Sequence, residues 1–196
     1  MYNLILKNIS RFIDLTEDEK TFFTSLLKIK KLRKKQYLLQ EGEISRYEYF
    51  VIKGCLRAYS IDEKGQEHIV QFAIEDWWIG DMYSFLTQTP GRLTVDALED
   101  SELFCLDNSS LETLFIRVPK FERFFRLLVQ NAFIAGQRRI IDSMSLTADE
   151  RYCGFIENYP LMERRLPLKQ IASFLGITPE SLSRIRSQYI KAAKSA

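Results

Sequence analysis

The sequence predicts an α+β protein in which an antiparallel β sandwich or barrel is followed by helices. Short runs rich in Tyr, Phe, Val and Ile, such as "YEYFVIKGCLRAYSI" and "EHIVQFAI", follow one another over the first hundred residues. Several short strands at this spacing favour antiparallel pairing over a parallel sheet. Beyond residue 108 the apolar residues recur at helical spacing instead. The chain therefore reads as a β domain followed by a helical region.

The composition indicates an ordinary globular chain without a membrane segment. Its 196 residues, 46% of them hydrophobic, suffice for one sizeable core or for two small ones. No apolar run approaches the roughly 20 residues of a membrane span. The N-terminal stretch "MYNLILKNISRFIDL" lacks the apolar core of a signal peptide. We expect a cytoplasmic protein that has no membrane partner.

The cysteines and the histidine limit the chemistry that the chain could carry. Cys55, Cys105 and Cys153 are too scattered for a zinc site or a disulfide framework, so we expect three free thiols. His68 is the only histidine and follows a predicted turn, which favours a position at the surface or on an edge strand. One histidine cannot supply the usual metal-ligand set of a jelly-roll enzyme. We therefore expect no catalytic residues, no metal and no cofactor.

The β region is preceded by a helix and divided by glycines. A helix is expected over residues 14–29, where Thr16 and Glu19 have the spacing of a capping box. The stretch "DEKGQE" predicts a hairpin turn in which Gly65 takes a positive φ. Two more strands are expected around 93–98 and 102–106. Trp77 and Trp78 precede these two strands and are expected to pack in the core or a loop.

Two further helices follow the strands. Ser109 and Glu112 suggest a capping box that opens the first. The second covers roughly 119–142 and carries an apolar stripe, which either the β domain or a twofold-related copy could bury. After a linker at 145–147, Thr147 and Glu150 have the spacing of a third capping box, for a helix that reaches about residue 158. The stripe consists of Phe121, Phe124, Phe125, Leu128, Ala132 and Ala135.

The stretch "LPLKQIASFLGITPESLSRI" predicts a helix-turn-helix near the end of the chain. Gly176 lies where a left-handed residue would end the first helix. Thr178 is suited to capping the second helix, and Pro179 to its first position. Leu182 and Ile185 then face inward, which leaves a polar and basic outer surface. Residues 142–196 also carry 8 Lys/Arg against 6 Asp/Glu, a local positive balance that suits a polyanion.

In this order, the motifs resemble those of the cyclic-AMP receptor protein / fumarate–nitrate reduction regulator (CRP/FNR) family of bacterial transcription factors. The resemblance is carried by "LLQEGE", "YFVIKGCLRAYSIDEKGQEHIVQF", "IGDMYSFL", "LTADERY" and "QIASFLGITPESLSRI". It implies a cyclic-nucleotide-binding-like jelly-roll sensor domain over 1–118, a dimerisation helix over 119–142 and a helix-turn-helix domain over 143–196. The implied function is sequence-specific binding of a near-palindromic DNA site by a homodimer, with RNA polymerase as a partner if the protein activates transcription.

The resemblance assigns DNA contacts to the helix-turn-helix. Glu180 and Arg184 match the family's base-reading pair, since a carboxylate accepts from cytosine and a guanidinium donates twice to guanine. Thr178 and Ser181 match its phosphate-contacting hydroxyls. The segment 159–167 is too short for the β-hairpin wing that many members have. The complete candidate set is Lys169, Thr178, Pro179, Glu180, Ser181, Ser183, Arg184 and Arg186, with Lys169 and Arg186 as weaker phosphate contacts.

The family's nucleotide pocket is altered in this chain. Asp81 stands where the resemblance implies a glutamate for the ribose, and Arg92 is displaced by one position from the family's phosphate-binding arginine. A one-residue shift turns a strand side chain to the other face. Cyclic AMP is therefore expected to bind weakly or not at all, which leaves another small effector and no effector as alternatives. The candidate ligand residues are Gly80, Asp81, Met82, Ser84, Arg92 and Thr94.

One alternative function remains beside transcription regulation. A cyclic-nucleotide-binding module that acts on a protein partner would share the β domain. It would not need Glu180 and Arg184 on the outer face of a capped terminal helix. DNA binding that weakens with salt would distinguish the two functions.

Overall fold

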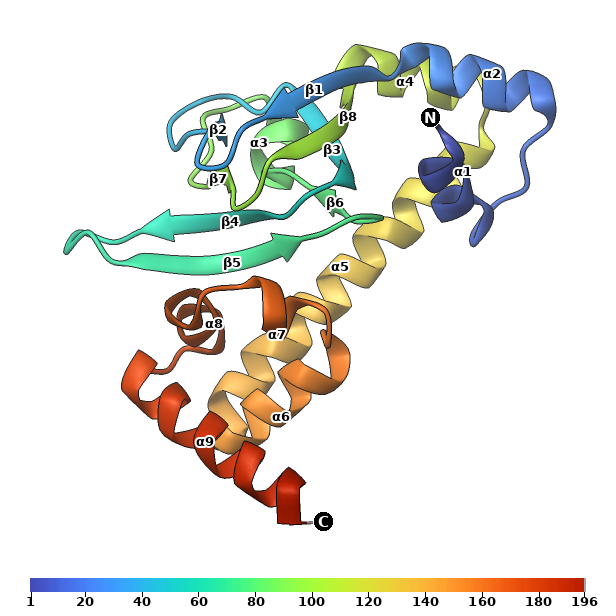
Figure 1. Cartoon of the computed structure of the whole chain (residues 1–196). Helices are drawn as coiled ribbons and strands as arrows, with labels where there is room; N and C mark the ends of the chain where they lie inside the picture. Colours follow the sequence, from blue (N-terminus) through green and yellow to red (C-terminus); the bar gives the residue numbers. More distant parts are fainter. Residues whose placement is uncertain (196) are drawn as a thin grey trace. The chain divides into compact units, whose positions relative to one another are not determined.

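The chain forms two compact units in a computed structural model that describes the backbone of residues 1–195 and the side chains of residues 1–189. The first unit comprises residues 1–60 and 70–131, and the second comprises 61–69 and 132–196. Two elements pass from one unit into the other: the hairpin whose tip is residues 61–69, and the long helix that continues past residue 131. Figure 1 gives the order of the elements along the chain.

The first unit is built on two four-stranded antiparallel sheets, as the strand pattern predicted (Figure 1). One sheet has the order β1-β8-β3-β6 and the other β2-β7-β4-β5. Their inner faces meet in an apolar core to which Val51, Leu56 and Leu103 contribute with no exposed surface. The strands are β1 (Lys28–Leu32), β2 (Tyr37–Leu39), β3 (Tyr47–Lys53), β4 (Leu56–Ile61), β5 (Glu67–Ala73), β6 (Trp78–Ile79), β7 (Thr94–Ala97) and β8 (Ser101–Asp107).

The first strand was not predicted. The helix expected over 14–29 begins at Glu17, after the Thr16–Glu19 capping box, and ends at Leu26. The next five residues, "KIKKL", pair with β8 as a sheet edge. Only Leu32 of this strand is buried, so its sequence lacks the apolar alternation that identifies a strand.

Helices cover the outer face of the first sheet. In the first unit they are α1 (Asn3–Ser10), α2 (Glu17–Leu26), α3 (Met82–Thr87), α4 (Asn108–Arg117) and the start of α5 (Lys120–Ser145). The stripe of α5 is divided: Phe121, Phe124 and Phe125 are buried in this unit's own core, and Leu128 packs against that core. Ala132 and Ala135 are exposed. The β domain therefore buries the first half of the stripe, the first of the two alternatives left open by the sequence.

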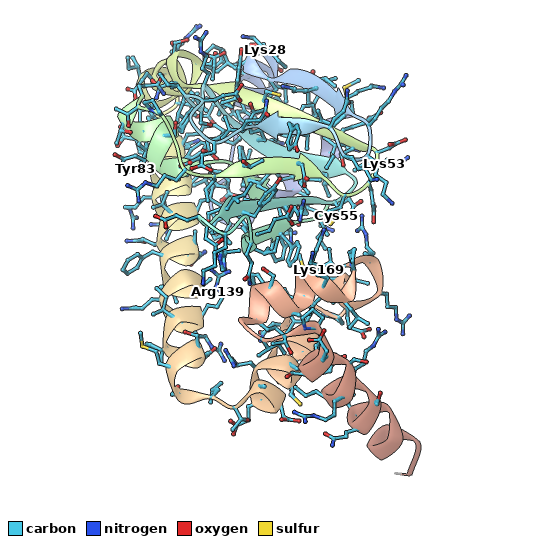
Figure 2. All side chains as sticks on the ribbon, turned by 90° about the vertical axis from the view of Figure 1, so that its left-hand side faces the viewer. Lys28, Lys53, Cys55, Tyr83, Arg139 and Lys169 are labelled. Carbon is cyan, nitrogen blue, oxygen red and sulfur yellow. The ribbon has the colours of Figure 1, made fainter. Side chains whose placement is uncertain are left out.

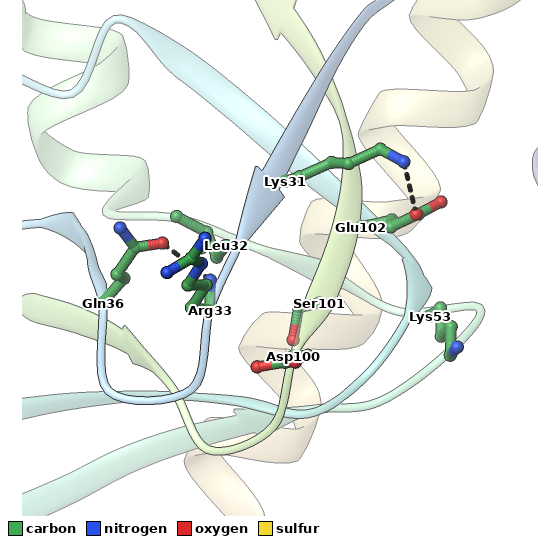
Figure 3. A pocket seen from close by; sticks show the side chains of 8 residues that line it. All are labelled: Lys31, Leu32, Arg33, Gln36, Lys53, Asp100, Ser101 and Glu102. Atoms are coloured by element: carbon green, nitrogen blue, oxygen red, sulfur yellow. Dashed lines mark hydrogen bonds and ion pairs between the residues drawn. The ribbon is translucent and has the colours of Figure 1, made fainter.

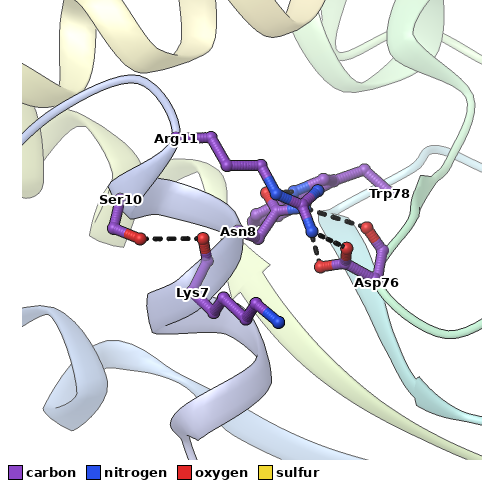
Figure 4. A network of polar contacts seen from close by, with 6 residues as sticks. All are labelled: Lys7, Asn8, Ser10, Arg11, Asp76 and Trp78. Carbon is purple, nitrogen blue, oxygen red and sulfur yellow. Dashed lines mark hydrogen bonds and ion pairs between the residues drawn. The ribbon is translucent and has the colours of Figure 1, made fainter.

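A polar network fastens α1 to the turn before β6 (Figure 4). Asn8 donates through Nδ2 to the backbone oxygen of Asp76 at 2.9 Å and to its carboxylate at 3.0 Å. Trp78 donates its indole N–H to Asn8 Oδ1 at 3.3 Å, and Arg11 pairs with the Asp76 carboxylate. The ring of Trp78 packs on Phe50 and Phe125, as expected of a core side chain. The N-terminal helix is thus an integral part of the first unit, although its sequence gave no helical prediction.

The predicted helix starts are confirmed at two of three places. The capping boxes Thr16–Glu19 and Thr147–Glu150 are both present. The pair Ser109 and Glu112 was a wrong assignment, because Asp107 caps α4 instead: its carboxylate accepts from Ser110 N at 2.8 Å. Asp107 ends β8 with an extended backbone and also accepts from Lys28 at 3.0 Å. A charged acceptor already held at the strand end outcompetes the serine hydroxyl two residues on.

The second unit packs α6 (Ala148–Asn158), α7 (Met162–Arg165), α8 (Leu168–Leu175) and α9 (Pro179–Ser195) together with residues 61–69. Tyr152 and Phe155 of α6 are buried in this unit. The predicted turn at 62–67 is confirmed, with Gly65 at a φ of 77°. His68 is half exposed at the start of β5 and lies 2.9 Å from an Asp62 carboxylate oxygen. Ser173 of α8 donates to the Glu67 carbonyl at 2.8 Å, which attaches the hairpin tip to the helix-turn-helix.

The three cysteines are free thiols, as the sequence suggested. None of the helices that the structure describes is long and apolar enough to cross a membrane.

Candidate nucleic-acid interface

The predicted helix-turn-helix is formed by α8 and α9. Gly176 ends α8 at a φ of 66°, and its N–H donates to the Ser173 carbonyl at 3.1 Å. The N–H of Ile177 donates to the Ala172 carbonyl at 3.0 Å, which completes a Schellman-type turn. Arg151 of α6 donates to the Leu175 carbonyl at 2.8 Å and satisfies another free acceptor of the helix end. The turn is therefore fixed by two backbone hydrogen bonds and one from a side chain.

The inner faces of the two helices are apolar and tightly packed. Ala172 has no exposed surface, and this small residue lets α9 cross close to α8. Leu182 and Ile185 of α9 are 0% and 4% exposed, as the helical spacing predicted. Residues at the intervening positions of α9 must then face outward.

The outer face of α9 is polar. Thr178 accepts the Ser181 N–H at 3.2 Å and so caps the helix, with Pro179 as its first residue. Glu180 and Arg184 are exposed one turn apart. No ion pair within the described part of the chain engages either side chain. Their charged groups are therefore available to an external partner.

The remaining sequence candidates differ in availability. Ser183 is exposed, and Lys169 is exposed on α8 (Figure 2). Ser181 is half-buried, and its hydroxyl oxygen lies 3.1 Å from that of Thr178. Arg186 turns back toward α7, where its Nε lies 3.0 Å from the Glu163 carboxylate. This internal ion pair makes Arg186 the weakest phosphate candidate.

One surface residue on this face was missed by the sequence reasoning. Gln188 is exposed and follows Arg184 by four residues, as Arg184 follows Glu180. The three side chains therefore form one row along α9. The sequence signal for Gln188 is that it continues the four-residue spacing of Glu180 and Arg184. It was missed because its side chain is uncharged. A Gln side chain can bind adenine in the major groove as well as a phosphate.

The segment 159–167, predicted to be too short for a β-hairpin wing, forms no hairpin in the structure. The segment before α8 folds as the short helix α7, and Arg164 of this helix is exposed. No strand occurs between α6 and α8 in the described chain.

The residues expected to bind a nucleotide all lie in the first unit, where the Asp81 carboxylate holds the loop before β7. Asp81 is 3% exposed and caps α3 by accepting the Ser84 N–H at 3.0 Å. Its other oxygen accepts the N–H groups of Arg92 and Leu93, each at 3.2 Å. A Cβ at Gly91 would lie 2.3 Å from the same oxygen. This carboxylate is therefore occupied by the protein's own backbone.

Among the other candidates, Ser84 and Thr94 also form hydrogen bonds within the protein, whereas Arg92 and Met82 lie elsewhere. Ser84 is fully buried, accepts from Ser45 N at 2.8 Å and donates to the Thr89 carbonyl at 2.6 Å. Thr94 accepts from Glu41 N at 3.2 Å. Arg92 is exposed. Met82 faces a cavity on the outer, helical side of the sheet, together with α4 and α5 residues.

A polar cavity of about 350 Å³ lies at the other end of the sandwich (Figure 3). Lys31 and Glu102 on its wall pair with each other at 2.8 Å. Gln36 accepts from Arg33 N at 2.6 Å, and Asp100 accepts from Lys34 N at 2.7 Å. Four of its polar side chains are thus engaged within the protein, and the side chains of Arg33 and Lys53 also line the cavity.

The chain combines a β sandwich with a helix-turn-helix whose outer face is polar. This combination is typical of a DNA-binding regulator. Comparison with known proteins gives the same class. Residues 29–117 match the family model described as the cyclic nucleotide-binding domain.

Relatives extend the match over both units. The regulatory protein HlyX of Actinobacillus pleuropneumoniae is 26% identical, over 90% of this chain and 78% of its own. The fumarate and nitrate reduction regulatory protein of Vibrio cholerae is 27% identical, over 90% and 75%. The solved structure of FixK2 from Bradyrhizobium japonicum superposes with a TM-score of 0.74 at 22% identity, over 85% of this chain and 86% of that one.

The chain belongs to the CRP/FNR family of transcription regulators. It is a DNA-binding regulator rather than an enzyme.

Proposed function

We propose that the protein binds a near-palindromic DNA site as a homodimer, with the outer face of α9 in the major groove. The observation that carries this proposal is the pair Glu180 and Arg184, exposed one turn apart on a rigidly capped helix. Arg184 would donate to guanine and Glu180 would accept from cytosine. Thr178 and Lys169 would contact phosphates, and Ser181 and Ser183 lie beside them. In this proposal residues 1–118 sense, 119–142 dimerise and 143–196 bind DNA.

The dimer proposal is supported by a second apolar stripe on α5. Phe133 is 68% exposed, Ile140 56% and Met144 82%. Val129 precedes them on the same helical face, and Gly136 lies between them. An exposed apolar stripe of this length on one helix is typical of a helix that pairs with a second copy. It follows, toward the C-terminal end of α5, the residues that pack in the core of the first unit.

Selection of bound fragments from randomised duplex DNA tests the proposed function. An inverted repeat with a guanine and a cytosine at fixed positions of each half is expected. A protein that acts through a protein partner alone would enrich no sequence. If the regulator activates transcription, RNA polymerase is a further expected partner. We propose the cytoplasm as the location of the regulator.

We further propose that cyclic AMP is not the effector. The Asp81 carboxylate already accepts hydrogen bonds from the backbone of the loop at Arg92 and Leu93. The side chain of Arg92 is exposed to solvent. A phosphate bound here without a paired arginine would lose hydration, and no charge-assisted hydrogen bond would offset that loss. Another small molecule, or none, then regulates the protein.

Isothermal titration of the full chain with cyclic AMP is expected to give no binding tighter than about 10 μM. Arg92→Ala should leave the titration unchanged. Binding below this value that the Arg92 substitution removes would show that the arginine does reach the phosphate, and the protein would then be a cyclic-nucleotide sensor.

A further inference from the structure

A cavity of about 470 Å³ lies on the helical side of the sensor sheet, where α3, α4 and the first half of α5 meet. This volume is in the range that accommodates a small organic ligand. Its wall is largely apolar, with Phe85 from α3, Leu111 and Phe115 from α4, and Phe125 from α5. The cavity lies entirely within the first unit.

A buried carboxyl group faces this apolar cavity. Glu48 of β3 lines it and is only 4% exposed. No donor among the described residues lies within hydrogen-bonding distance of its Oε1 atom. A buried acceptor left unpaired is destabilising, so such groups are rare unless they serve a ligand, an ion or water.

The backbone is shaped to hold this carboxyl in place. A Cβ at Gly80 would lie 2.7 Å from Oε1 and 2.9 Å from Oε2 of Glu48. Only glycine at this position leaves room for the glutamate. The carboxyl is thus held between its strand and the start of α3, in the wall of the cavity.

The charges around the cavity favour a cationic partner. Glu112 of α4 and Glu122 of α5 are exposed on its rim, together with the single cation Arg126. Arg126 donates to Gln130 at 3.1 Å. Asp81, before α3, adds a further negative charge near Glu48. The lining therefore combines an apolar body, a buried acceptor and an excess of carboxylates.

We propose that this cavity binds a small amphipathic amine, with its ammonium group on Glu48 and its apolar part among Phe85, Leu111 and Phe125. The site lies on the opposite side of the sheet from the sandwich interior. It is independent of DNA binding by α9.

The protonation state of Glu48 gives this proposal a specific signature. Burial, and then the nearby charge of Asp81, raise the pKa of Glu48 to about 8, so the carboxyl is protonated in the free protein at pH 7. An ammonium ion bound there stabilises the carboxylate instead. The carboxyl proton is then released to solvent as the ammonium–carboxylate pair forms, about nine-tenths of a proton per ligand at pH 7.

Three probes that share a benzyl group test the site by isothermal titration of the full chain: 2-phenylethylamine, 2-phenylethanol and phenylacetate. We expect the amine to bind with a dissociation constant below about 1 mM, the alcohol more weakly and the acid not at all. Titrations in phosphate and in Tris, which differ in ionisation enthalpy, should show the proton release for the amine alone.

Glu48→Gln keeps the shape of the side chain and removes its charge. This variant should weaken amine binding at least tenfold and abolish the proton release, while alcohol binding is kept, which also shows that the cavity is intact. Glu122→Gln on the rim is the matched control and should change amine affinity less than threefold. The proposal is overturned if no probe binds, if phenylacetate binds best, or if Glu48→Gln leaves the amine affinity and the proton release unchanged.

Discussion

Replacing both Phe133 and Ile140 by glutamate is expected to give a monomer that no longer binds its specific DNA site. The two side chains are 68% and 56% exposed and lie on one face of α5. In a twofold pair of helices each would meet its own copy or its neighbour, so the double variant would bring four like charges into an apolar seam. Because neither residue is buried within the chain, the fold of each unit should survive.

Loss of the dimer should have a large effect on DNA affinity. Two linked reading helices bind a palindrome with an advantage of about 10²–10⁴ over one helix. Sedimentation at micromolar concentration should therefore show half the wild-type mass, and anisotropy titration should show a loss of this size. Circular dichroism should show that the helices remain.

Ala135→Glu is the matched control for this surface. Ala135 is exposed and lies about 200° around the helix from Phe133, so it points away from the proposed interface. The control should sediment as the wild type does. A wild-type protein that is itself monomeric at micromolar concentration, with and without DNA, contradicts the dimer proposal.

Arg184→Ala is expected to weaken binding to the specific site by about 1–3 kcal/mol per half-site and to relax the preference at one base pair. The guanidinium is exposed, and no ion pair within the described residues holds it. Its removal should leave the packing of α9 unchanged, since Leu182 and Ile185 carry that packing. Anisotropy titrations against every base substitution at the affected position would measure the effect.

Arg164→Ala provides the comparison for a basic residue outside α9. Arg164 is exposed on α7, so its loss should not alter base preference. If Arg184→Ala weakened specific and random DNA equally, the arginine would be a backbone contact and the base-reading assignment would be wrong.

The helix-turn-helix was predictable because its determinants are local. Gly176, Thr178 and Pro179 lie within four residues, and each acts on the backbone of its own turn. The inward residues follow from helical spacing alone. The antiparallel sandwich was predictable for a similar reason, since its strands are short and are separated by turn residues.

The parts that were missed depend on contacts distant in sequence. The α1 helix is held by Asn8, whose partners lie almost 70 residues away. The strand β1 forms because β8 offers a free edge. On α5 the sequence predicted one apolar stripe, from Phe121 to Ala135, and only the packed structure reveals that Phe124 faces the core of the first unit while Phe133 is exposed.

The contacts at the candidate ligand-binding residues could not be predicted from the sequence for the same reason. The residue types at Gly80, Asp81 and Arg92 were identified, but the three-way engagement of the Asp81 carboxylate depends on the fold of the loop. Glu48 was not singled out, because a glutamate in an apolar strand gives no sign that its neighbour Gly80 makes room for it.

The symmetry of the DNA that the full chain selects from a randomised duplex pool tests the central claim most directly. We expect two inverted half-sites whose centres are about 10 base pairs, or roughly 34 Å, apart, each with a conserved guanine and cytosine. Scrambling one half should weaken binding by about 10² or more. Selection of a single unrepeated site, a direct repeat, or no sequence at all would contradict it.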